Sequence, residues 1–488
     1  MSSNSRNPID NSEKIDEFTN NSTNVLKNVE SAEEKRLLQK IDLRIIPIVT
    51  ILYIIGFLDR VNIGNAKLAH LELDLSLTGD EYNWVLGIFF LGYVLFEVPS
   101  NIALIKIKPS IWISTFMVGW GIIMTGMAFV KNFSELMAAR LLLGVFQSGL
   151  FPGVVFYLTK WYKKSERTYR ISLFFSGATI AGAFNGLFAY AITNLNGKFN
   201  LHGWQWLFIL DGVITVIIAF FSYFLISDYA ETTSWLTEDE RKLAVDRLRY
   251  DGGHAHTTHF DKHQILRAFK DSKIYIFMIL YFCLIVTLYS FSFFVPTIVN
   301  DLGFNVVISQ LLSIPPFILG CISCLVIAKL SDHFGVRSPY LIFCLLISIF
   351  GYAILIVPNA STAVKYTAIC IVGLGAFPTV PTTLAWVTNN LAGDSKRAVG
   401  TAMVISWGNI GGGISAQIYR SSDAPTYKIG HSITLSLLVV AVIITIFQRY
   451  LLKRINKYKL ENPELFLKGS NGDASHLGDS HPSFIYSL

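Results

Sequence analysis

Charged residues are scarce in this sequence. They make up 15% of the 488 residues, whereas hydrophobic residues make up 52%. Soluble domains are about 25% charged, so the composition excludes an ordinary soluble protein and indicates an integral membrane protein. The net charge of +6 then belongs to loops that flank the membrane, and we expect no nucleic-acid partner.

Cysteine is also scarce. All five cysteines fall within apolar segments: Cys283, Cys321, Cys324, Cys344 and Cys370. Cys321 and Cys324 form a C-x-x-C motif, but no second pair accompanies it and its surroundings are apolar. We interpret all five as small core residues, and we predict no disulfide framework.

Catalytic and metal-binding motifs are absent as well. The sequence contains neither H-E-x-x-H nor G-x-S-x-G, so we expect a protein that is not an enzyme and has no cofactor or metal. Four histidines lie close together at His254, His256, His259 and His263. Neither their spacing nor a carboxylate partner defines a metal geometry, and we interpret this stretch as a solvated linker.

Long apolar segments, in contrast, are abundant. A helix that crosses a membrane needs about 20 mostly apolar residues, and twelve segments of this kind follow one another along the chain. Their centres lie near Ile54, Leu91, Met117, Phe146, Ala181, Ile217, Val286, Ile318, Ile347, Gly373, Ile405 and Val439. We therefore predict an all-α integral membrane fold with twelve transmembrane helices.

Polar stretches divide the chain into five parts. We expect a disordered cytosolic tail at 1–42, a six-helix bundle at 43–227, a cytosolic linker at 228–272, a second six-helix bundle at 273–455 and a cytosolic tail at 456–488. Within the linker, Thr237 and Glu240 have the spacing of a capping box. This spacing predicts a short amphipathic helix at the membrane surface.

Basic residues concentrate on one side of the predicted membrane. Of the 40 Lys and Arg residues, only six lie opposite the two termini: Lys67, Lys131, Lys198, Lys365, Arg420 and Lys428. Because basic loops face the cytosol, we expect both termini to be cytosolic.

The two halves of the chain resemble each other weakly. Phe-Pro steps begin at Phe151 and Phe377, and each is expected to break the helix in which it stands. A charged turn with Arg167 or Arg397 follows each step. Repeats of this kind are typical of transporters built from two six-helix halves, so we predict that the two bundles are pseudo-symmetric.

Longer motifs carry a family resemblance: "AKLSDHFGVRS", "FLDRVNIGNAK", "YVLFEVPSN", "RLLLGVFQSGLFPG", "WYKKSER", "GWQWLFILDG" and "WVTNNLAGDSKRAVGTAM". The first resembles the Asp-x-x-Gly-x-Arg loop signature of the major facilitator superfamily. The others are similar to the anion:cation symporter family, in its fungal allantoate permease branch, over about residues 43–455. The resemblance implies alternating-access transport of small carboxylates such as nicotinate, pantothenate or allantoate. It suits the plasma membrane, with endoplasmic reticulum and vacuole left open, and we expect a lipid-embedded monomer.

Two opposite charges interrupt the first span. Asp59 and Arg60 are neighbours, so their side chains leave a helix about 100° apart, and one can face a central cavity while the other faces an adjacent helix. In the fourth span, Arg140 and Gln147 lie on one helix face. Because a charge in the bilayer is functional by default, we predict that Arg60 and Arg140 clamp a carboxylate. The alternative is that both arginines pair with Asp59 and Glu97 to hold the bundle together.

The resemblance also implies a coupling role for Asp59. In the family, an Asp-Arg pair in span one, and a carboxylate seven residues after the span-four Arg, are associated with proton coupling and substrate binding. Asp59, Arg60 and Arg140 match, but Gln147 is an amide that cannot titrate. Asp59 is thus the predicted carrier of a coupling proton, Gln147 stays a substrate-binding candidate, and an uncoupled facilitator is the alternative.

Other polar residues are candidates for substrate contact or for gating. We predict substrate contact for Tyr53, Tyr157 and Asn409, of which Asn409 is favoured because glycines beside it let the backbone open. The residues predicted to control conformation are Glu97, Glu166, Arg167, Asp332 and Arg337. Asp211 is expected to anchor the cytosolic surface or to accept a hydrogen bond from a neighbouring arginine.

The leading functional hypothesis is a secondary transporter that couples a small organic anion to protons. A nutrient sensor on the same fold is the second hypothesis. Against the sensor, the tail before residue 43 and the linker after Asp228 are short and lack motifs of signalling domains.

Overall fold

The structure is a computed structural model. It describes residues 9–68, 70–77, 79–163, 165–193, 195–252, 262–304, 306–415, 417–419, 423, 425–462, 478–479, 481 and 484–488. Helices joined by short turns make up these residues, and none of the described residues lies in a strand.

The first bundle contains the helices of the first six predicted spans. Its helices are α1 (Ile9–Leu68), α2 (Leu71–Asp74), α3 (Gly79–Lys106), α4 (Pro109–Met127), α5 (Phe133–Gln147), α6 (Leu150–Leu158), α7 (Arg167–Thr193), a 3-10 turn (Lys198–Asn200) and α8 (Gly203–Leu225). Helices α5 and α6 together form the fourth span, and α2 is a short turn after the first span.

Two shorter helices, α9 (Glu238–Gly252) and α10 (Lys262–Lys270), connect the bundles. The second bundle consists of α11 (Ser272–Asp301), α12 (Val306–Phe334), α13 (Ser338–Ile356), α14 (Thr362–Asn389), α15 (Asp394–Ser415) and α16 (Lys428–Glu461). Every predicted span is therefore a helix. Ten of the twelve are long and apolar enough to cross a membrane among the residues described, and α7 and α15 are the two that are not.

The bundles meet through two matched pairs of helices. Helix α3, the second span, packs against α15, the eleventh, and α7, the fifth, packs against α12, the eighth. The second span of one repeat corresponds to the eighth span in the other repeat, and the eleventh span corresponds to the fifth. The two pairs are therefore equivalent under exchange of the repeats. The contact between the bundles thus has the pseudo-two-fold arrangement that the internal repeat predicted.

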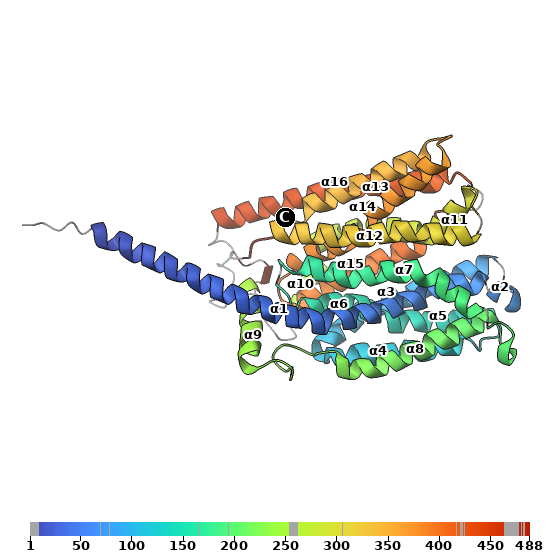
Figure 1. The fold of residues 1–488 in the computed structure, drawn as a ribbon, viewed down its shortest axis with the longest axis horizontal. Coiled ribbons are helices and arrows are strands. Elements are labelled where there is room, and N and C mark those ends of the chain that lie inside the picture. The colour runs from blue at the N-terminus through green and yellow to red at the C-terminus, as the bar shows by residue number, and fades with distance from the viewer. Residues whose placement is uncertain are drawn as a thin grey trace, which may run out of the picture.

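Both ends of the described chain lie at the same end of the molecule. Figure 1 shows the start of α1 and the end of α16 on the left, together with α9 and α10, whereas α2 lies on the right. We call the left end the inner side and the right end the outer side. The sequence predicts that the inner side faces the cytosol.

The N-terminal boundary predicted at residue 42 is wrong. Helix α1 already includes residues 9–42, and Leu37 is almost fully buried. Lys40 also donates to both oxygens of Glu240 on α9, at 2.9 and 2.7 Å. The polar composition suggested disorder, but Glu34, Lys40 and Asp42 form ion pairs with residues of other elements.

The C-terminal segment is also part of the folded protein. Helix α16 continues to residue 461, and the last residues return to the inner end of the second bundle. The indole of Trp386 donates to the carbonyl of Ser487 at 2.8 Å, and Asn390 exchanges two hydrogen bonds with the same residue. The predicted cytosolic tail at 456–488 thus includes residues that cover the ends of α13 and α14.

The linker contains the predicted capping box. The backbone N–H of Thr237 donates to Glu240 at 2.9 Å, and the backbone N–H of Glu240 donates to the Thr237 hydroxyl at 3.3 Å. These reciprocal bonds confirm the predicted start of α9. The sequence did not indicate α10. Three of the four linker histidines, His254, His256 and His259, lie outside the described residues.

The predicted Phe-Pro breaks differ between the repeats. The fourth span is interrupted between α5 and α6, just before Phe151. Helix α14 instead runs through Pro378 and Pro381 without interruption. The prediction of a break at Phe377 is wrong because α14 is buried on all sides in this region, where neighbouring helices support the backbone around a proline.

Candidate functional site

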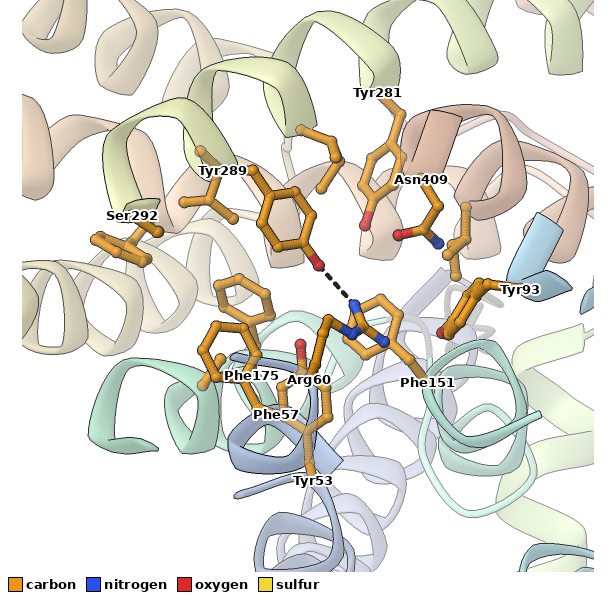
Figure 2. A pocket seen from close by; sticks show the side chains of 15 residues that line it. Tyr53, Phe57, Arg60, Tyr93, Phe151, Phe175, Tyr281, Tyr289, Ser292 and Asn409 are labelled. Atoms are coloured by element: carbon orange, nitrogen blue, oxygen red, sulfur yellow. Dashed lines mark hydrogen bonds between the residues drawn. The ribbon is translucent and has the colours of Figure 1, made fainter. Parts of the chain in front are cut away.

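A pocket lies between the two bundles (Figure 2). Helices α1, α3, α6, α7, α11, α14 and α15 contribute its lining: Tyr53, Phe57, Arg60, Tyr93, Phe151, Phe175, Ala178, Tyr281, Ile285, Leu288, Tyr289, Ser292, Phe377, Ile405 and Asn409. Both bundles therefore contact anything that binds there. Such a position is typical of the substrate site in transporters built from repeats.

Arg60 is the charged residue among those that line the pocket. Its guanidinium donates to the hydroxyl of Tyr289 across the bundle interface, at 2.6 Å (Figure 2). The same group lies over the ring of Tyr93, 4.9 Å from its centroid. Arg60 thus joins α1 to α11 through a neutral partner, while its Nε atom has no hydrogen-bond partner in the described structure.

Neither Arg60 nor Arg140 forms an ion pair within the part of the chain that the structure describes. The Nε atom of Arg60 has no hydrogen-bond partner there, and neither do Nε and Nη1 of Arg140. This result excludes, for the described residues, the alternative in which both arginines pair with Asp59 and Glu97. The half-buried Arg60 and the buried Arg140 thus have no carboxylate at ion-pair distance among the described residues.

Asp59 points away from the pocket, as the angle between neighbouring helix positions allows. Its carboxylate accepts from the indole of Trp120 on α4 at 2.8 Å and from the hydroxyl of Thr215 on α8 at 3.1 Å. Asp211, one turn before Thr215, accepts from Asn62. The expectation that Asp211 anchors the inner surface is therefore wrong, because it is buried beside α1 in the bundle interior.

The ring of Phe89 contacts both arginines. The centroid of its ring is 5.3 Å from the guanidinium carbon of Arg60 and 5.2 Å from that of Arg140. Gly144 permits this packing, because a Cβ there would lie 2.1 Å from the carbonyl oxygen of Phe89. Arg140 is therefore close to the pocket but does not line it, and Gln147 is buried on the same helix with both amide atoms unpartnered in the described structure.

Aromatic rings form one wall of the pocket. Tyr53 stacks on Phe151, with centroids 5.1 Å apart, and packs against Phe174 at 4.5 Å. These rings come from α1, α6 and α7. A flat, partly apolar ligand can pack on such a wall while a polar group contacts Arg60.

Glu97 and Asn409 lie on opposite sides of the bundle interface. The carboxylate of Glu97 on α3 accepts from the hydroxyl of Ser406 at 2.9 Å and from the amide of Asn409 at 3.4 Å, both on α15. Asn409 also lines the pocket. The predicted substrate candidate and the predicted gating residue are thus in contact with each other.

Tyr157 is not at the pocket. Its hydroxyl donates to the carbonyl of Ser227 at 2.6 Å, close to the end of α8 on the inner side. The prediction of substrate contact for Tyr157 therefore finds no support in the geometry. The sequence places Tyr157 within a predicted span, which suggested a polar group in the membrane. Its hydroxyl instead connects α6 to the residues that follow α8.

Contacts between the bundles close the inner side. Arg167, at the start of α7, donates to the side-chain oxygen of Asn389 on α14 at 3.3 Å. The carboxylate of Asp332, on α12, accepts from the backbone N–H of Tyr169 at 2.8 Å. We call these contacts, together with the ion pair between Lys160 and Asp394, the inner gate.

The other predicted gating residues support the gate from within one bundle. Arg337 pairs with Asp332 at 2.7 Å, and both belong to the second bundle. Glu166 pairs with Arg247 of α9, and although Arg247 opposes the effect, burial raises the pKa of the Glu166 carboxyl. Neither Glu166 nor Arg337 forms the contacts that define the inner gate.

Sequence reasoning missed Tyr281, Lys160 and Asp394. Tyr281 lines the pocket with Ile285 and Tyr289, which follow it at four-residue intervals on α11. That spacing, which places all three on one helix face, was the available signal. No local signal paired Lys160 with Asp394, because they are far apart in the sequence.

Comparison with known proteins identifies the family. Residues 49–416 match the Major Facilitator Superfamily. The chain belongs to the major facilitator superfamily. This major facilitator protein is 36% identical to an uncharacterized transporter of Schizosaccharomyces pombe over 455 residues, which cover 93% of this chain and 90% of the relative. It is 33% identical to the MFS-type transporter cnsO of Penicillium expansum, over 95% of this chain and 92% of the relative.

Solved structures share the fold of this major facilitator protein. The proton:xylose symporter XylE, bound to 6-bromo-6-deoxy-D-glucose, superimposes with a TM-score of 0.66 at 14% identity, covering 82% of this chain and 95% of XylE. The Escherichia coli fucose:proton symporter FucP superimposes with a TM-score of 0.61 at 15% identity. The match covers 83% of this chain and 99% of FucP. At this identity the likeness concerns the fold alone.

Proposed function

We propose that this major facilitator protein is a secondary transporter that carries a small organic anion together with a proton. The observation that carries the proposal is Arg60, a guanidinium that lines the pocket between the bundles and has no ion-pair partner among the described residues. The relatives that are named as transporters support the general class. The organic anion and the proton are our own inference.

An anionic ligand would give Arg60 the ion-pair partner that it lacks among the described residues. A charge at the centre of a membrane-spanning helix costs about 2.5–3.5 kcal/mol on insertion scales, and here the chain supplies a hydroxyl and aromatic rings in place of a carboxylate. A guanidinium also binds a carboxylate through two parallel hydrogen bonds. A substrate with one carboxylate therefore fits the site better than a neutral sugar does.

The remaining lining favours a small polar body on that carboxylate. Tyr53 and Phe151 provide an aromatic wall, and Asn409 offers an amide on the opposite bundle. Vitamin-type or nitrogen-source acids such as nicotinate, pantothenate and allantoate have this character. The resemblance to the allantoate permease branch supports the same class of substrate.

Alternating access requires that the inner gate open. In the present conformation Arg167, Lys160 and Asp332 join the bundles on the inner side. Rocking the bundles about the pocket breaks these contacts and exposes the site to the other face of the membrane. We propose that the inner side faces the cytosol, that the membrane is the plasma membrane, and that the protein acts as a lipid-embedded monomer.

The proton is the proposed coupling ion. The family resemblance points to Asp59 as its carrier, and this assignment stays a prediction. The carboxylate of Asp59 contacts α4 and α8 instead of the pocket. One observation favours an uncoupled facilitator as the second candidate function: the buried side chain at 147 is an amide that cannot take up a proton.

Uptake of labelled carboxylates tests the proposal. Cells that express the chain are given nicotinate, pantothenate or allantoate at acid and at neutral external pH, with and without a protonophore. We expect accumulation at acid pH that collapses with the protonophore. Entry that only equilibrates at either pH would establish the facilitator, and the absence of entry for every acid would contradict the proposed substrate class.

A further inference from the structure

Glu97 is a fully buried carboxylate at the interface of the bundles. It stands on α3, and its Oε2 atom accepts from Ser406 and Asn409 of α15. The second oxygen, Oε1, has no hydrogen-bond partner in the part of the chain that the structure describes. The carboxylate therefore has one oxygen engaged across the interface and one oxygen available to a proton.

The groups that face Glu97 come from three helices. Arg60 approaches from α1 and Tyr281 from α11, and Tyr93 stands one turn before Glu97 on α3 itself. Arg60 is the one cation among them, and the two tyrosines are neutral hydroxyls. Asp59 and Asp211 are directed into the interior of the first bundle, so Glu97 is the carboxylate that reaches the pocket through its contact with Asn409.

Charge balance then links a proton to the anion. In the empty site the positive Arg60 faces the negative Glu97. A substrate carboxylate that binds Arg60 adds a second negative charge, and like charges in a low-dielectric site favour protonation of one of them. A proton on Glu97 restores neutrality, because Arg60 then balances the substrate alone.

We infer that Glu97 is the group that carries the coupling proton when an organic anion binds Arg60, an inference that rests on the proposed function. The proton enters from water on the outer side and binds Oε1, and it leaves to water on the inner side with the substrate. No other bond is made or broken. One proton accompanies each substrate carboxylate, so the loaded site has the same net charge as the empty one.

The position of Glu97 also connects protonation to movement. Ionised Glu97 attracts the Ser406 and Asn409 donors and so holds α3 against α15. A protonated carboxyl is a weaker acceptor, which loosens this contact. Helices α3 and α15 form one of the two pairs through which the bundles meet, and these pairs must rearrange when the bundles rock.

The test compares Glu97→Gln with the parent protein in proteoliposomes. The probe is whichever of labelled nicotinate, pantothenate and allantoate the parent carries, and the external medium is acid while the lumen is neutral. We expect the variant to retain exchange of labelled for unlabelled substrate at equal pH but to lose accumulation against the gradient. The pH dependence of the KM should also flatten, since the amide cannot titrate.

Three further variants make the test decisive. Glu97→Asp should restore pH-driven accumulation in part, and Glu461→Gln, which neutralises an exposed carboxylate at the end of α16, controls for the loss of a charge. Asp59→Asn tests the rival carrier. Loss of accumulation in Asp59→Asn with full accumulation in Glu97→Gln would overturn the role of Glu97.

The outcomes separate this inference from the proposed function. A parent that accumulates substrate with acid pH, and a Glu97→Gln variant that does the same, would overturn the role of Glu97 and leave proton symport intact. A parent that only equilibrates its substrate would overturn symport and the role of Glu97 together. If Glu97→Gln fails to reach the membrane, the shifted pH dependence of Glu97→Asp decides, because an unshifted profile would contradict the inference.

Discussion

Buried arginines have different partners in the two functional regions of the molecule. At the inner side, Arg337 forms an ion pair with Asp332 at 2.7 Å, and Arg247 forms one with Glu166. Near the pocket, Arg60 contacts a tyrosine hydroxyl and aromatic rings, with no described carboxylate as its ion-pair partner.

This difference separates structural charges from charges that await a ligand. Removing one partner of a buried ion pair costs about 3–5 kcal/mol, so each of these arginines depends on a carboxylate that the chain itself supplies. Arg60 instead contacts neutral groups of the chain, a hydroxyl and aromatic rings, which leave its charge unpaired at this distance. Its position in the pocket is explained by a negative charge that arrives from outside.

The largest expected effect is that of Arg60→Gln. Losing charge-assisted hydrogen bonds to the substrate, each worth about 1.5–3 kcal/mol, should lower uptake by roughly 100-fold. Thermal stability in detergent should change little, because the substitution removes a cation that has no ion-pair partner among the described residues. Normal uptake by Arg60→Gln would remove the anion site from this pocket.

Asp332→Asn should have the next largest effect. The amide weakens both the hydrogen bond from the Tyr169 backbone and the pairing with Arg337. The lost interaction energy of about 1–2 kcal/mol should lower uptake by about 10-fold. The inner gate should also open more often. This is measured as faster thiol labelling of Ala398→Cys, which is fully buried at the gate.

The matched control for the gate is Glu166→Gln. It neutralises a carboxylate on the same side of the molecule that pairs with α9 and does not join the two bundles. Labelling of Ala398→Cys should stay slow in this background. Equal acceleration by both substitutions would mean that general loss of charge, and not the bridge at Asp332, opens the inner side.

Arg140→Lys should have a smaller effect on uptake than Arg60→Gln. Arg140 does not line the pocket, so it acts on the substrate through the electrostatic field around the pocket in this conformation. We expect the KM to rise several-fold with little change in the maximal rate. A loss as large as that of Arg60→Gln would instead establish the two-arginine clamp, with Phe89 moving aside when substrate binds.

The positions of the spans and the opposite directions of Asp59 and Arg60 could be predicted from the sequence. Both depend on local properties, namely runs of apolar residues and the rotation between neighbouring helix positions. The capping box of α9 is local in the same way, and Thr237 and Glu240 form it as predicted.

Features that depend on the neighbours of each helix could not be predicted. Phe89 contacts two arginines of other helices, and Tyr157 turns to a carbonyl after α8. The return of residues 484–488 onto α14 likewise depends on contacts between distant segments. Periodicity shows which residues share a helix face, but it does not show which helix that face meets.

The smallest expected effect on uptake is that of Asp479→Asn, in the C-terminal segment. Asp479 accepts from Lys396 at 2.6 Å and lies 3.4 Å from Lys273. Burial alone would raise the pKa of the Asp479 carboxyl, but the two ammonium groups hold it below its usual value. The segment is far from Arg60 in the fold, so uptake should change less than two-fold while stability falls.

The pH dependence of that stability has a definite sign. Because the pKa of Asp479 is lower in the folded protein than in the unfolded chain, its contribution is complete above about pH 4, the usual range of an Asp, and is lost as the pH falls through the folded-state value. The melting temperatures of parent and Asp479→Asn should therefore differ at neutral pH and converge in strong acid. A constant difference across this range would show that the contact depends on packing and not on the charge of Asp479. Strongly reduced uptake would instead connect the C-terminal segment to the transport site.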